Sequence, residues 1–482
     1  MINSRSIFKI LGFLLFLEGI FILSAVPVAM IYGESDVAKI FISALFAIFV
    51  GGIPLLLTWK SKITISKKDG YIIVSSGWIL LSVFGAIPFV FTGAIPSYTD
   101  AFFETMSGFT TTGASILNDI ESLSHGLLYW RSLTQWIGGM GIIVLSLAIL
   151  PLLGIGGMEL FVAEVPGPVP DKLHPRVKGT AKRLWLIYVT LTVAQTLLLW
   201  FGDMDLYDAV CHSFTTMATG GYSTKQASIA YWDSPYIHYV IILFMFIAGT
   251  NFTLSYFALH FRFRRLFVDE EFRYYFGIVI IFTLFMTLIM IFTMNGAVEE
   301  SFRYTLFQVV SLMTTTGFIT SDYELWKPVL IFALVILMFI GGSAGSTGGG
   351  VKVVRLVLVL KNSALELKRL IHPNAIIPVR YNNQTVNPQI ITNVLAFVSF
   401  YILIAVIGII IMSVFGYDLD TSLGAVVTCL GNVGPGLGLV GPIDSFSHIP
   451  AFGKWFLSFL MLIGRLELFT VLVLFTPEFW KK

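Results

Sequence analysis

YTDAFFETMSGFTTTGAS, at residues 98–115, begins as a short helix-like segment and ends in a threonine-rich loop around Gly113. Three later segments have the same plan and also lie between apolar runs: LYDAVCHSFTTMATGGYS at 206–223, FRYTLFQVVSLMTTTGFIT at 302–320 and LDTSLGAVVTCLGNVGPG at 419–436. We align the four copies on one glycine each, at Gly113, Gly220, Gly317 and Gly434. The intervals of 107, 97 and 117 residues give a unit of about a hundred residues, and a repeat of this kind determines the architecture.

Long apolar runs separate these segments. Hydrophobic residues make up 56% of the sequence and charged residues 12%, whereas an ordinary soluble domain has about 25% charged residues. The first run carries Arg5 and Lys9 near its start, as a signal peptide does, but it is long and has no clear cleavage site, so we expect a retained span. Runs long enough to cross a core of about 30 Å lie at 7–32, 36–58, 71–95, 127–150, 183–202, 236–260, 274–294, 327–342, 390–415 and 452–475.

Each unit has the order span, half-helix, glycine loop, span. One such unit cannot close a pore, whereas four units around an axis can, and this chain carries all four covalently. The sequence therefore predicts an all-α polytopic membrane protein with four fused repeats around a central pore and an extra N-terminal helix pair. The expected divisions are 1–60 for the helix pair, and 61–165, 166–265, 266–383 and 384–482 for the repeats.

Basic residues are unevenly distributed over the predicted topology. If the N-terminus is cytoplasmic, only six basic residues fall on the opposite side of the membrane: Lys39, Arg131, Lys225, Arg303, Lys327 and Lys454. The positive-inside rule then places both termini in the cytoplasm. A net charge of +2 without a basic, aromatic-interleaved stripe does not favour a nucleic-acid partner. Cys211 and Cys429 fall in apolar segments and offer neither a disulfide framework nor a metal-ligand spacing.

The glycine loops have the composition that a dehydrated cation needs. Inside a bilayer such a cation needs oxygen ligands in place of water, and a ring of backbone carbonyls supplies them. Glycine permits the positive φ that lets these carbonyls face one path. Packing glycines between helices are the alternative, but four loops in register favour a cation path. Hydroxyls that could tie the loops down or extend the oxygen lining come from Thr110, Thr111, Thr112, Thr219, Ser223, Thr314, Thr315 and Thr316.

The half-helix before each loop adds partial negative charge, because its C-terminal end points to the pore centre. Acidic residues lie near three half-helix starts, at Asp100, Asp208 and Asp420, and Glu299 and Glu300 lie upstream in the third repeat. These positions suit both helix capping and a cation-attracting outer vestibule.

Several motifs resemble one family of bacterial membrane proteins. The loops match it through FTTTGAS at 109–115, TMATGGYS at 216–223, MTTTGF at 313–318 and CLGNVGPGLG at 429–438. Outside the loops, the likeness includes WRSLTQWIGGMGIIVLSLAILP at 130–151, FIGGSAGSTGGG at 339–350 and GRLEL at 464–468. Nearly end to end, the chain resembles the TrkH subunit of the bacterial Trk potassium uptake system, within the TrkH, TrkG and KtrB superfamily. The extra N-terminal helix pair favours TrkH over the shorter KtrB.

The resemblance implies a fold like four fused potassium channel subunits, and a homodimer with one pore per protomer. No loop has the TVGYG string of true potassium channels, so it implies fewer carbonyl rings and moderate discrimination against sodium, with rubidium permeating well. Potassium would bind a selectivity filter lined by Thr111, Thr112, Gly113, Thr219, Gly220, Thr315, Thr316, Gly317, Asn432, Val433 and Gly434.

The segment GGSAGSTGGG at 341–350 interrupts what would be one long helix. Irregular backbone at membrane depth is tolerated only where it lines a cavity or is buried in protein. By resemblance it is an intramembrane loop beneath the filter that blocks conduction until it moves; a role in packing alone is the alternative. Its gating glycines are Gly341, Gly342, Gly345, Gly348, Gly349 and Gly350.

Arg465 stands in the otherwise apolar final span. A charge there is costly unless it faces a cavity or a partner, and Glu467, two residues on, would point away from it on a helix. By resemblance, Arg465 lies in the ion path, where it raises the barrier for cations and takes part in gating. A buried structural ion pair is the alternative.

Two basic segments, 166–183 and 352–383, are too large for simple turns. Positive charge next to anionic lipid is the general explanation, and by resemblance the segments also dock a cytoplasmic TrkA-like ring of RCK domains that binds ATP, ADP or NADH. The sequence has no Rossmann fingerprint or P-loop, so the nucleotide would bind the partner, and no covalent cofactor is expected here. The resemblance places the chain in the bacterial inner membrane.

A symporter and a membrane enzyme are the alternatives to a channel-like path. A symporter that couples potassium to protons or sodium usually has titratable residues at the membrane midplane, and the filter loops have none. We expect Glu18, Glu104, Glu159 and His212 near interfaces or in structural roles. An enzyme is disfavoured because the seven histidines are scattered and no HExxH motif occurs, whereas symport stays open.

Overall fold

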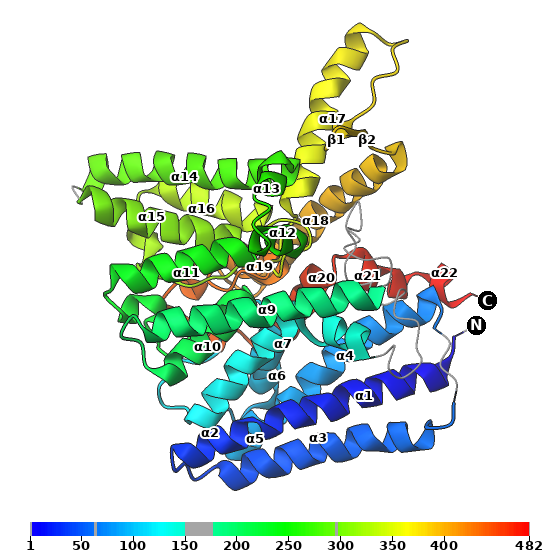
Figure 1. Ribbon diagram of the computed structural model, residues 1–482, viewed down its shortest axis with the longest axis vertical. Coiled ribbons are helices and arrows are strands. Elements are labelled where there is room, and N and C mark those ends of the chain that lie inside the picture. Colours follow the sequence, from blue (N-terminus) through cyan, green and yellow to red (C-terminus); the bar gives the residue numbers. More distant parts are fainter. Residues whose placement is uncertain (1, 62–64, 150–176, 295–296, 482) are drawn as a thin grey trace.

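The computed structural model describes residues 2–61, 65–149, 177–294 and 297–481, and Figure 1 shows their arrangement. Within these ranges, six helices are long and apolar enough to cross a membrane, and two further pairs of helices form a bent apolar span each. The chain is therefore a multi-pass helical membrane protein, as its composition predicts. The expected division between residues 165 and 166, and the first part of the basic segment 166–183, lie outside the described residues.

The N-terminal helix pair lies at the edge of the molecule (Figure 1). Its first member is α1 (Ser4–Leu23) continued by the short α2 (Ala25–Ile31), and its second member is α3 (Val37–Leu57). The two long helices approach closely at Gly12, Gly19 and Gly51. A β-carbon at any of these glycines would lie under 3.0 Å from the opposite helix, so small residues bring the two backbones together, as is common in membrane helices. The pair packs against the first helix of the first repeat.

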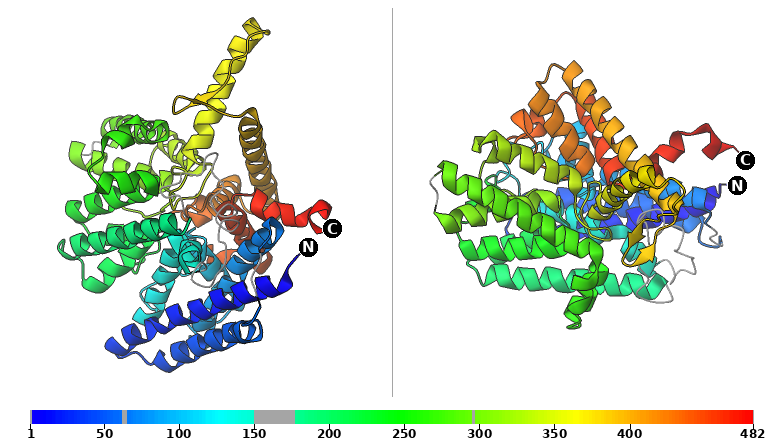
Figure 2. Two further views of the ribbon diagram at one scale, coloured as in Figure 1. Left: turned by 45° about the vertical axis from the view of Figure 1, so that its right-hand side comes forward. Right: turned by 90° about the horizontal axis from the view of Figure 1, so that it is seen from above.

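Four repeats follow, each with a first span, a short pore helix, a loop and a second span (Figures 1 and 2). The first contains α4 (Lys67–Gly85), α5 (Ile87–Thr92), α6 (Tyr98–Phe109) and α7 (His125–Ile149). The second contains α9 (Val177–Trp200), α10 (Leu206–Met217), α11 (Pro235–Ala248) and α12 (Phe252–Leu259). After the short α13 (Arg264–Val268), the third contains α14 (Glu270–Met294), α15 (Val298–Met313), α16 (Pro328–Ile340) and α17 (Val353–Ile371). The fourth contains α18 (Pro388–Val414), α19 (Leu419–Gly431), α20 (Ala451–Arg465) and α21 (Phe469–Leu472), followed by α22 (Pro477–Trp480).

The pore helices α6, α10, α15 and α19 begin in related ways. Ser97, Asp205 and Asp418 cap three of them, because each side chain accepts a hydrogen bond from a backbone N–H of the first turn. The remaining pore helix, α15 of the third repeat, has no side-chain cap among the described residues and carries two glutamates in its first turn. Three acidic residues for which capping is one interpretation lie inside the first turn of their helices: Asp100, Asp208 and Asp420. Their charge there faces the positive end of the helix dipole.

Two apolar spans are sharply bent. The helices α11 and α12 meet at 115°, and α20 meets the helical segment after it at 112°. The second bend contains Glu467 and Leu468, whose φ angles of +55° and +46° are uncommon for residues other than glycine. The apolar run predicted at 452–475 is therefore divided by a bend: α20 ends at Arg465, so this arginine lies at a helix end.

α17 and the start of α18 project from the helical body (Figures 1 and 2). A small antiparallel hairpin, β1 (Arg380–Tyr381) and β2 (Gln384–Thr385), lies between these two helices. The N- and C-termini lie close together at one end of the molecule in both figures, and Lys68 Nζ donates a hydrogen bond to the Phe479 carbonyl at 2.6 Å.

The buried apolar side chains form two large clusters. One joins the N-terminal pair with the first and fourth repeats, and the other joins the second and third repeats. Buried hydroxyl and amide side chains are concentrated on the pore helices and in the loops that follow them. The pore loops therefore form a polar centre shared by two apolar halves.

Candidate ion pathway

The four glycine loops share one backbone conformation. The first residue of each is left-handed: Thr111 (φ +54°), Thr219 (+53°), Thr315 (+60°) and Asn432 (+54°). Two positions later each loop has a glycine with positive φ: Gly113 (+84°), Gly221 (+75°), Gly317 (+79°) and Gly434 (+103°). The residue between them donates its N–H to the carbonyl five positions earlier, at 2.8 to 2.9 Å in every repeat. The four segments are therefore equivalent in conformation as well as in sequence.

This equivalence corrects the register of the second repeat. The glycine that corresponds to Gly113 is Gly221, and Gly220 takes the place of Thr112. The alignment on Gly220 is thus wrong by one residue, although Ser223 lies two positions after Gly221 just as Ser115 lies two positions after Gly113. Gly221 belongs to the loop and was missing from the predicted lining.

The loops form a closed ring. A β-carbon added to the left-handed glycine of any loop would lie under 3.0 Å from a carbonyl oxygen of the next loop around the axis. The four glycine and carbonyl pairs are Gly113 with Gly220, Gly221 with Thr316, Gly317 with Val433, and Gly434 with Thr112. Because the last pair returns to the first repeat, carbonyls and glycines alternate around one axis, and no side chain fits between neighbouring loops.

A cavity of about 80 Å³ opens at the glycine end of the loops, and all four left-handed glycines line it. Its wall also includes Lys225 and Asp444. Lys225 Nζ lies 3.9 Å from a Glu121 carboxylate oxygen and 4.0 Å from one of Asp208. These carboxylates therefore offset the positive charge of Lys225 at this mouth of the path.

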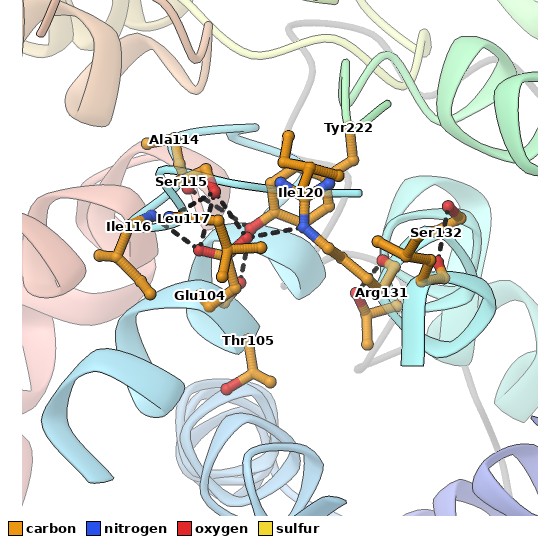
Figure 3. Close-up of polar contacts among 12 residues, drawn as sticks. Glu104, Thr105, Ala114, Ser115, Ile116, Leu117, Ile120, Arg131, Ser132 and Tyr222 are labelled. Carbon is orange, nitrogen blue, oxygen red and sulfur yellow. Dashed lines mark hydrogen bonds and ion pairs between the residues drawn. The ribbon is translucent and has the colours of Figure 1, made fainter. Parts of the chain in front are cut away.

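A buried ion pair supports the first two loops (Figure 3). Arg131 Nε on α7 lies 2.7 Å from Glu104 on α6, and the two side chains are 2% and 1% exposed. The same carboxylate accepts hydrogen bonds from the Ser115 hydroxyl at 3.0 Å and the Ile116 N–H at 2.9 Å. Arg131 also donates to the Ser223 carbonyl at 3.0 Å. One pair thus connects a pore helix, a second span and the segments after two loops.

Two further side chains complete this support. The Arg131 guanidinium lies over the Tyr222 ring at 3.5 Å, and the Tyr222 hydroxyl donates to the Glu104 carbonyl at 2.6 Å. Gln135 donates to the Gly220 carbonyl at 2.6 Å and accepts from the Tyr222 N–H at 3.0 Å. It also fills the space that a side chain at Gly220 would need. Sequence reasoning missed Arg131 and Gln135 as site residues, although polar groups in an apolar run were a usable signal.

The segment 341–350 meets the opposite end of the loops. It runs between α16 and α17, and Gly341, Gly345 and Gly350 have positive φ. Gly349 N–H donates to the Thr315 hydroxyl at 2.7 Å, and Thr347 donates to the Met217 carbonyl at 3.1 Å. The segment is thus buried in protein against the ends of the pore helices, where irregular backbone is tolerated.

The remaining predicted gating glycines also lie in close contact. β-Carbons at Gly348 and Gly349 would lie under 3.0 Å from the Thr314 and Gly431 carbonyls. Gly342 packs on Gly249 of the second repeat, and the adjacent Ser343 donates its N–H to the Gly249 carbonyl at 2.9 Å.

Arg465 joins this segment to the first repeat. It donates to the Thr347 carbonyl at 2.6 Å and to the Gly138 and Gly139 carbonyls of α7 at 2.5 and 2.8 Å. Glu467 instead forms an ion pair with Arg355 at the start of α17. All the residues predicted for the filter and gate therefore meet in one region, with the filter loops between the cavity and segment 341–350.

This arrangement defines a class of protein, a polytopic helical membrane protein in which four fused pore-loop repeats surround a central pore. The chain belongs to the TrkH family of cation transport proteins, whose family model matches residues 37–482. The family is one of transporters and not of enzymes.

Known relatives match the chain along its whole length. It is 43% identical to the Trk system potassium uptake protein TrkH of Escherichia coli K12, and 35% identical to TrkG of the same strain, with 99% of each chain covered. The crystal structure of the potassium transporter TrkH from Vibrio parahaemolyticus is 37% identical, covers 100% of both chains and has a TM-score of 0.89. The family and the fold class predicted from the sequence are both confirmed.

Proposed function

We propose that this protein takes up potassium across the bacterial inner membrane by a passive, channel-like route along the axis of its four repeats. The closed ring in which the carbonyls of Thr112, Gly220, Thr316 and Val433 alternate with glycines carries the proposal. A dehydrated potassium ion needs oxygen ligands on several sides, and four equivalent loops supply them. Relatives named as potassium uptake proteins support potassium as the ion.

The filter would consist of three residues from each loop, from the left-handed first residue to the positive-φ glycine two positions later. Potassium would bind there as the transported ion. Each loop contributes one such segment, compared with the five-residue TVGYG string of potassium channels. Fewer carbonyl rings would leave moderate discrimination against sodium and good passage of rubidium. The corrected register adds Gly221 to the eleven predicted filter residues.

Segment 341–350 would act as the gate. Its contacts with Thr315 and the Met217 carbonyl lie where an ion would leave the filter, and Arg465 holds it through the Thr347 carbonyl. The guanidinium would also raise the electrostatic barrier for a cation that passes. Release of these hydrogen bonds would be needed for conduction.

A cytoplasmic RCK-type ring, resembling TrkA, would control this gate and bind the nucleotide. The projecting α17 begins directly after the gate segment and carries Lys361, Lys368 and Arg369, so a regulator that docks on it could move the gate. Both termini would lie on the same cytoplasmic side, and the protein would work as a homodimer with one pore in each protomer.

Symport with protons or sodium is the alternative, and one observation favours it. Glu18 lies in the middle of the candidate span Ser4–Ile31 and is fully buried. Neither of its carboxylate oxygens has a hydrogen-bond partner in the described part of the chain. Buried ionisable groups of this kind often mark proton pathways. Glu18 lies near Gly85 and the Phe109 ring, behind the first pore helix.

Rubidium uptake into potassium-loaded proteoliposomes tests the two functions. With no proton or sodium gradient, a channel-like path gives uptake that follows an imposed membrane potential. Uptake that requires a proton gradient, and is lost in Glu18→Gln, would favour symport. Glu300→Gln, on the exposed surface, is the matched control.

A further inference from the structure

The hydrogen bonding of the left-handed first residue's side chain differs between the four loops. Thr315 Oγ1 accepts the Gly349 N–H at 2.7 Å, and Thr219 Oγ1 lies 3.3 Å from Thr347 Oγ1. Both partners belong to the segment 341–350. Thr111 Oγ1 is buried and has no hydrogen-bond partner among the described residues. The hydroxyl at this position therefore contacts segment 341–350 in the second and third repeats. In the first repeat it has no hydrogen-bond partner within the described ranges.

The fourth left-handed residue completes this set. Asn432 directs its amide nitrogen to Thr112 Oγ1 at 2.9 Å and to the Met461 carbonyl at 3.0 Å. Its amide oxygen has no partner in the described part of the chain. A β-carbon at Gly349 would come within 3.1 Å of that oxygen. Three of these side chains, those of Thr219, Thr315 and Asn432, thus lie at the end of the filter that the segment contacts. Thr111 holds the equivalent backbone position in the first repeat.

One N–H of the segment faces these oxygens, and two cationic side chains outside the segment bind its carbonyls. The Gly349 N–H points to Thr315, while Lys352 Nζ donates to the Gly348 carbonyl and Arg465 to the Thr347 carbonyl. Two ammonium or guanidinium charges therefore stand directly behind the residues that touch the filter. A potassium ion at this position needs the same oxygens and carries the same sign of charge.

We propose that segment 341–350 and a potassium ion compete for the oxygens at the inner end of the filter, with the Thr315 hydroxyl as the main point of competition. The inference rests on the proposed gate. A bound ion displaces the Gly349 N–H, and the closed segment excludes the ion. By linkage, each lowers the affinity of the other by the same factor. Potassium is then both the transported ion and a ligand that favours the open gate.

The fit of the segment makes the competition steric as well as electrostatic. The glycines at 348 and 349 have no room for a β-carbon against the Thr314 and Gly431 carbonyls. An ion and its ligands cannot share this space with the segment. The equilibrium therefore has two states, segment bound or ion bound.

A cysteine in the segment reports its position without measuring transport. Ser346 is half-buried and donates to the Ser343 carbonyl at 2.6 Å, and the native Cys211 and Cys429 are buried. We would measure the rate at which a neutral maleimide labels Ser346→Cys in the full chain in nanodiscs. Potassium chloride would be compared with choline chloride at constant ionic strength. Potassium should accelerate labelling and the effect should saturate.

Three variants on this reporter separate the segment contact from the ion contact. Thr315→Val removes the acceptor and should raise the labelling rate in choline about two- to tenfold, the effect of one neutral hydrogen bond. Thr315→Ser keeps the hydroxyl and should behave as the parent. Thr111→Val removes an equivalent hydroxyl that has no segment contact, so the rate in choline should not change while the half-saturating potassium concentration rises.

Rubidium flux in the same preparations separates this inference from the proposed function. Selective flux with labelling that does not respond to potassium would overturn the competition and leave the channel in place. A Thr315→Val rate in choline equal to that of the parent would also overturn it. Gel filtration shows whether Thr315→Val folds. If it does not, Thr111→Val provides the test: a half-saturating potassium concentration equal to that of the parent would contradict competition for the oxygens at the inner end of the filter. Flux in the parent that does not discriminate between rubidium and sodium would instead contradict the proposed function.

Discussion

Arg131 reaches across the first repeat to Glu104, and the 2.7 Å pair is almost fully buried. Its hydrogen bonds extend to Ser223 beyond the second loop. The pair therefore fixes the relative position of two of the four loops. Such a pair adds little net stability, but removal of one partner leaves a buried charge without compensation.

Glu104→Gln should therefore destabilise the fold by about 3–5 kcal/mol, the usual result of breaking a buried pair. It should also lower the ratio of rubidium to sodium uptake, because the first two loops lose their common support. Thermal unfolding in detergent and isotope uptake measure these effects. The control is Glu121→Gln, since Glu121 is 46% exposed and lies 3.9 Å from Lys225. An equally small effect for both variants would contradict the supporting role.

Gly113→Ser should weaken discrimination between potassium and sodium. The new side chain takes a positive φ, which costs about 1–2 kcal/mol, and also collides with the Gly220 carbonyl of the neighbouring loop. Gly416→Ser is the matched control, since Gly416 also has positive φ (+88°) and has nothing within 4 Å of its β-carbon position. Unchanged selectivity in Gly113→Ser would remove Gly113 from the filter.

Gly221→Ala tests the corrected register. The β-carbon at Gly221 would meet the Thr316 carbonyl, whereas one at Gly220 would meet the Gln135 side chain. Gly221→Ala should therefore reduce selectivity even when Gln135 is shortened to Ala. Gly220→Ala should be rescued by Gln135→Ala, because the obstructing side chain is gone. Rescue of both variants, or of neither, would contradict this register.

Arg465→Ala should raise basal rubidium flux about tenfold, which corresponds to about 1.4 kcal/mol of barrier. It removes a positive charge from the proposed path and also the hydrogen bond that holds the Thr347 carbonyl. Initial uptake rates with the chain alone provide the measurement. Arg264→Ala, at an exposed site on α13, should leave the rate unchanged. No increase in Arg465→Ala would remove the arginine from the path.

Glu324 should make stability depend on pH. It follows the third loop and accepts the Gly438 N–H at 2.5 Å. Burial raises the pKa of Glu324 above its ordinary value, with Asp322, Asp444 and Asp420 adding to the increase and the Gly438 N–H opposing it. The protonated form is therefore favoured in the folded state, so its stabilising contribution is present at low pH and lost as pH rises through the folded-state pKa.

In the parent, the unfolding temperature should fall as the pH rises from below about 4.3, the ordinary glutamate pKa, to neutrality. The variant Glu324→Gln, whose side chain stays neutral, should show a smaller fall over the same pH range. Glu300→Gln, on the exposed start of α15, serves as the control for general charge effects. An unchanged pH profile in Glu324→Gln would contradict this assignment.

The sequence predicted the repeats well because apolar run length and the recurring loops each carry a strong local signal. The loop residues that it selected lie together, since chain order alone places each loop after its pore helix. The choice of Gly220 was an error of alignment, because Ser223 follows Gly221 at the spacing at which Ser115 follows Gly113. The position of Gln135 against Gly220 depends on the fold and could not be predicted.

Long-range polar contacts were harder to predict. Glu104 was expected in a structural role, but its partner Arg131 could not be identified without the fold. Arg465 was expected in the final apolar span, and the bend at Glu467 and Leu468, which was not predicted, places it at a helix end. Glu467, at that bend, pairs with Arg355 at the start of α17, which is distant in the chain. Tertiary packing determines such features, and local sequence patterns carry no record of them.

The most direct measurement of the central claim is rubidium and sodium uptake into sealed, potassium-loaded proteoliposomes that contain the chain alone, without nucleotide or proton gradient. The carbonyl ring predicts uptake that favours rubidium, falls when external potassium competes, and follows an imposed membrane potential. Uptake that does not discriminate between rubidium and sodium would contradict the filter. Uptake that occurs only with a proton or sodium gradient, even in Arg465→Ala and with the cytoplasmic regulator present, would contradict a channel-like path.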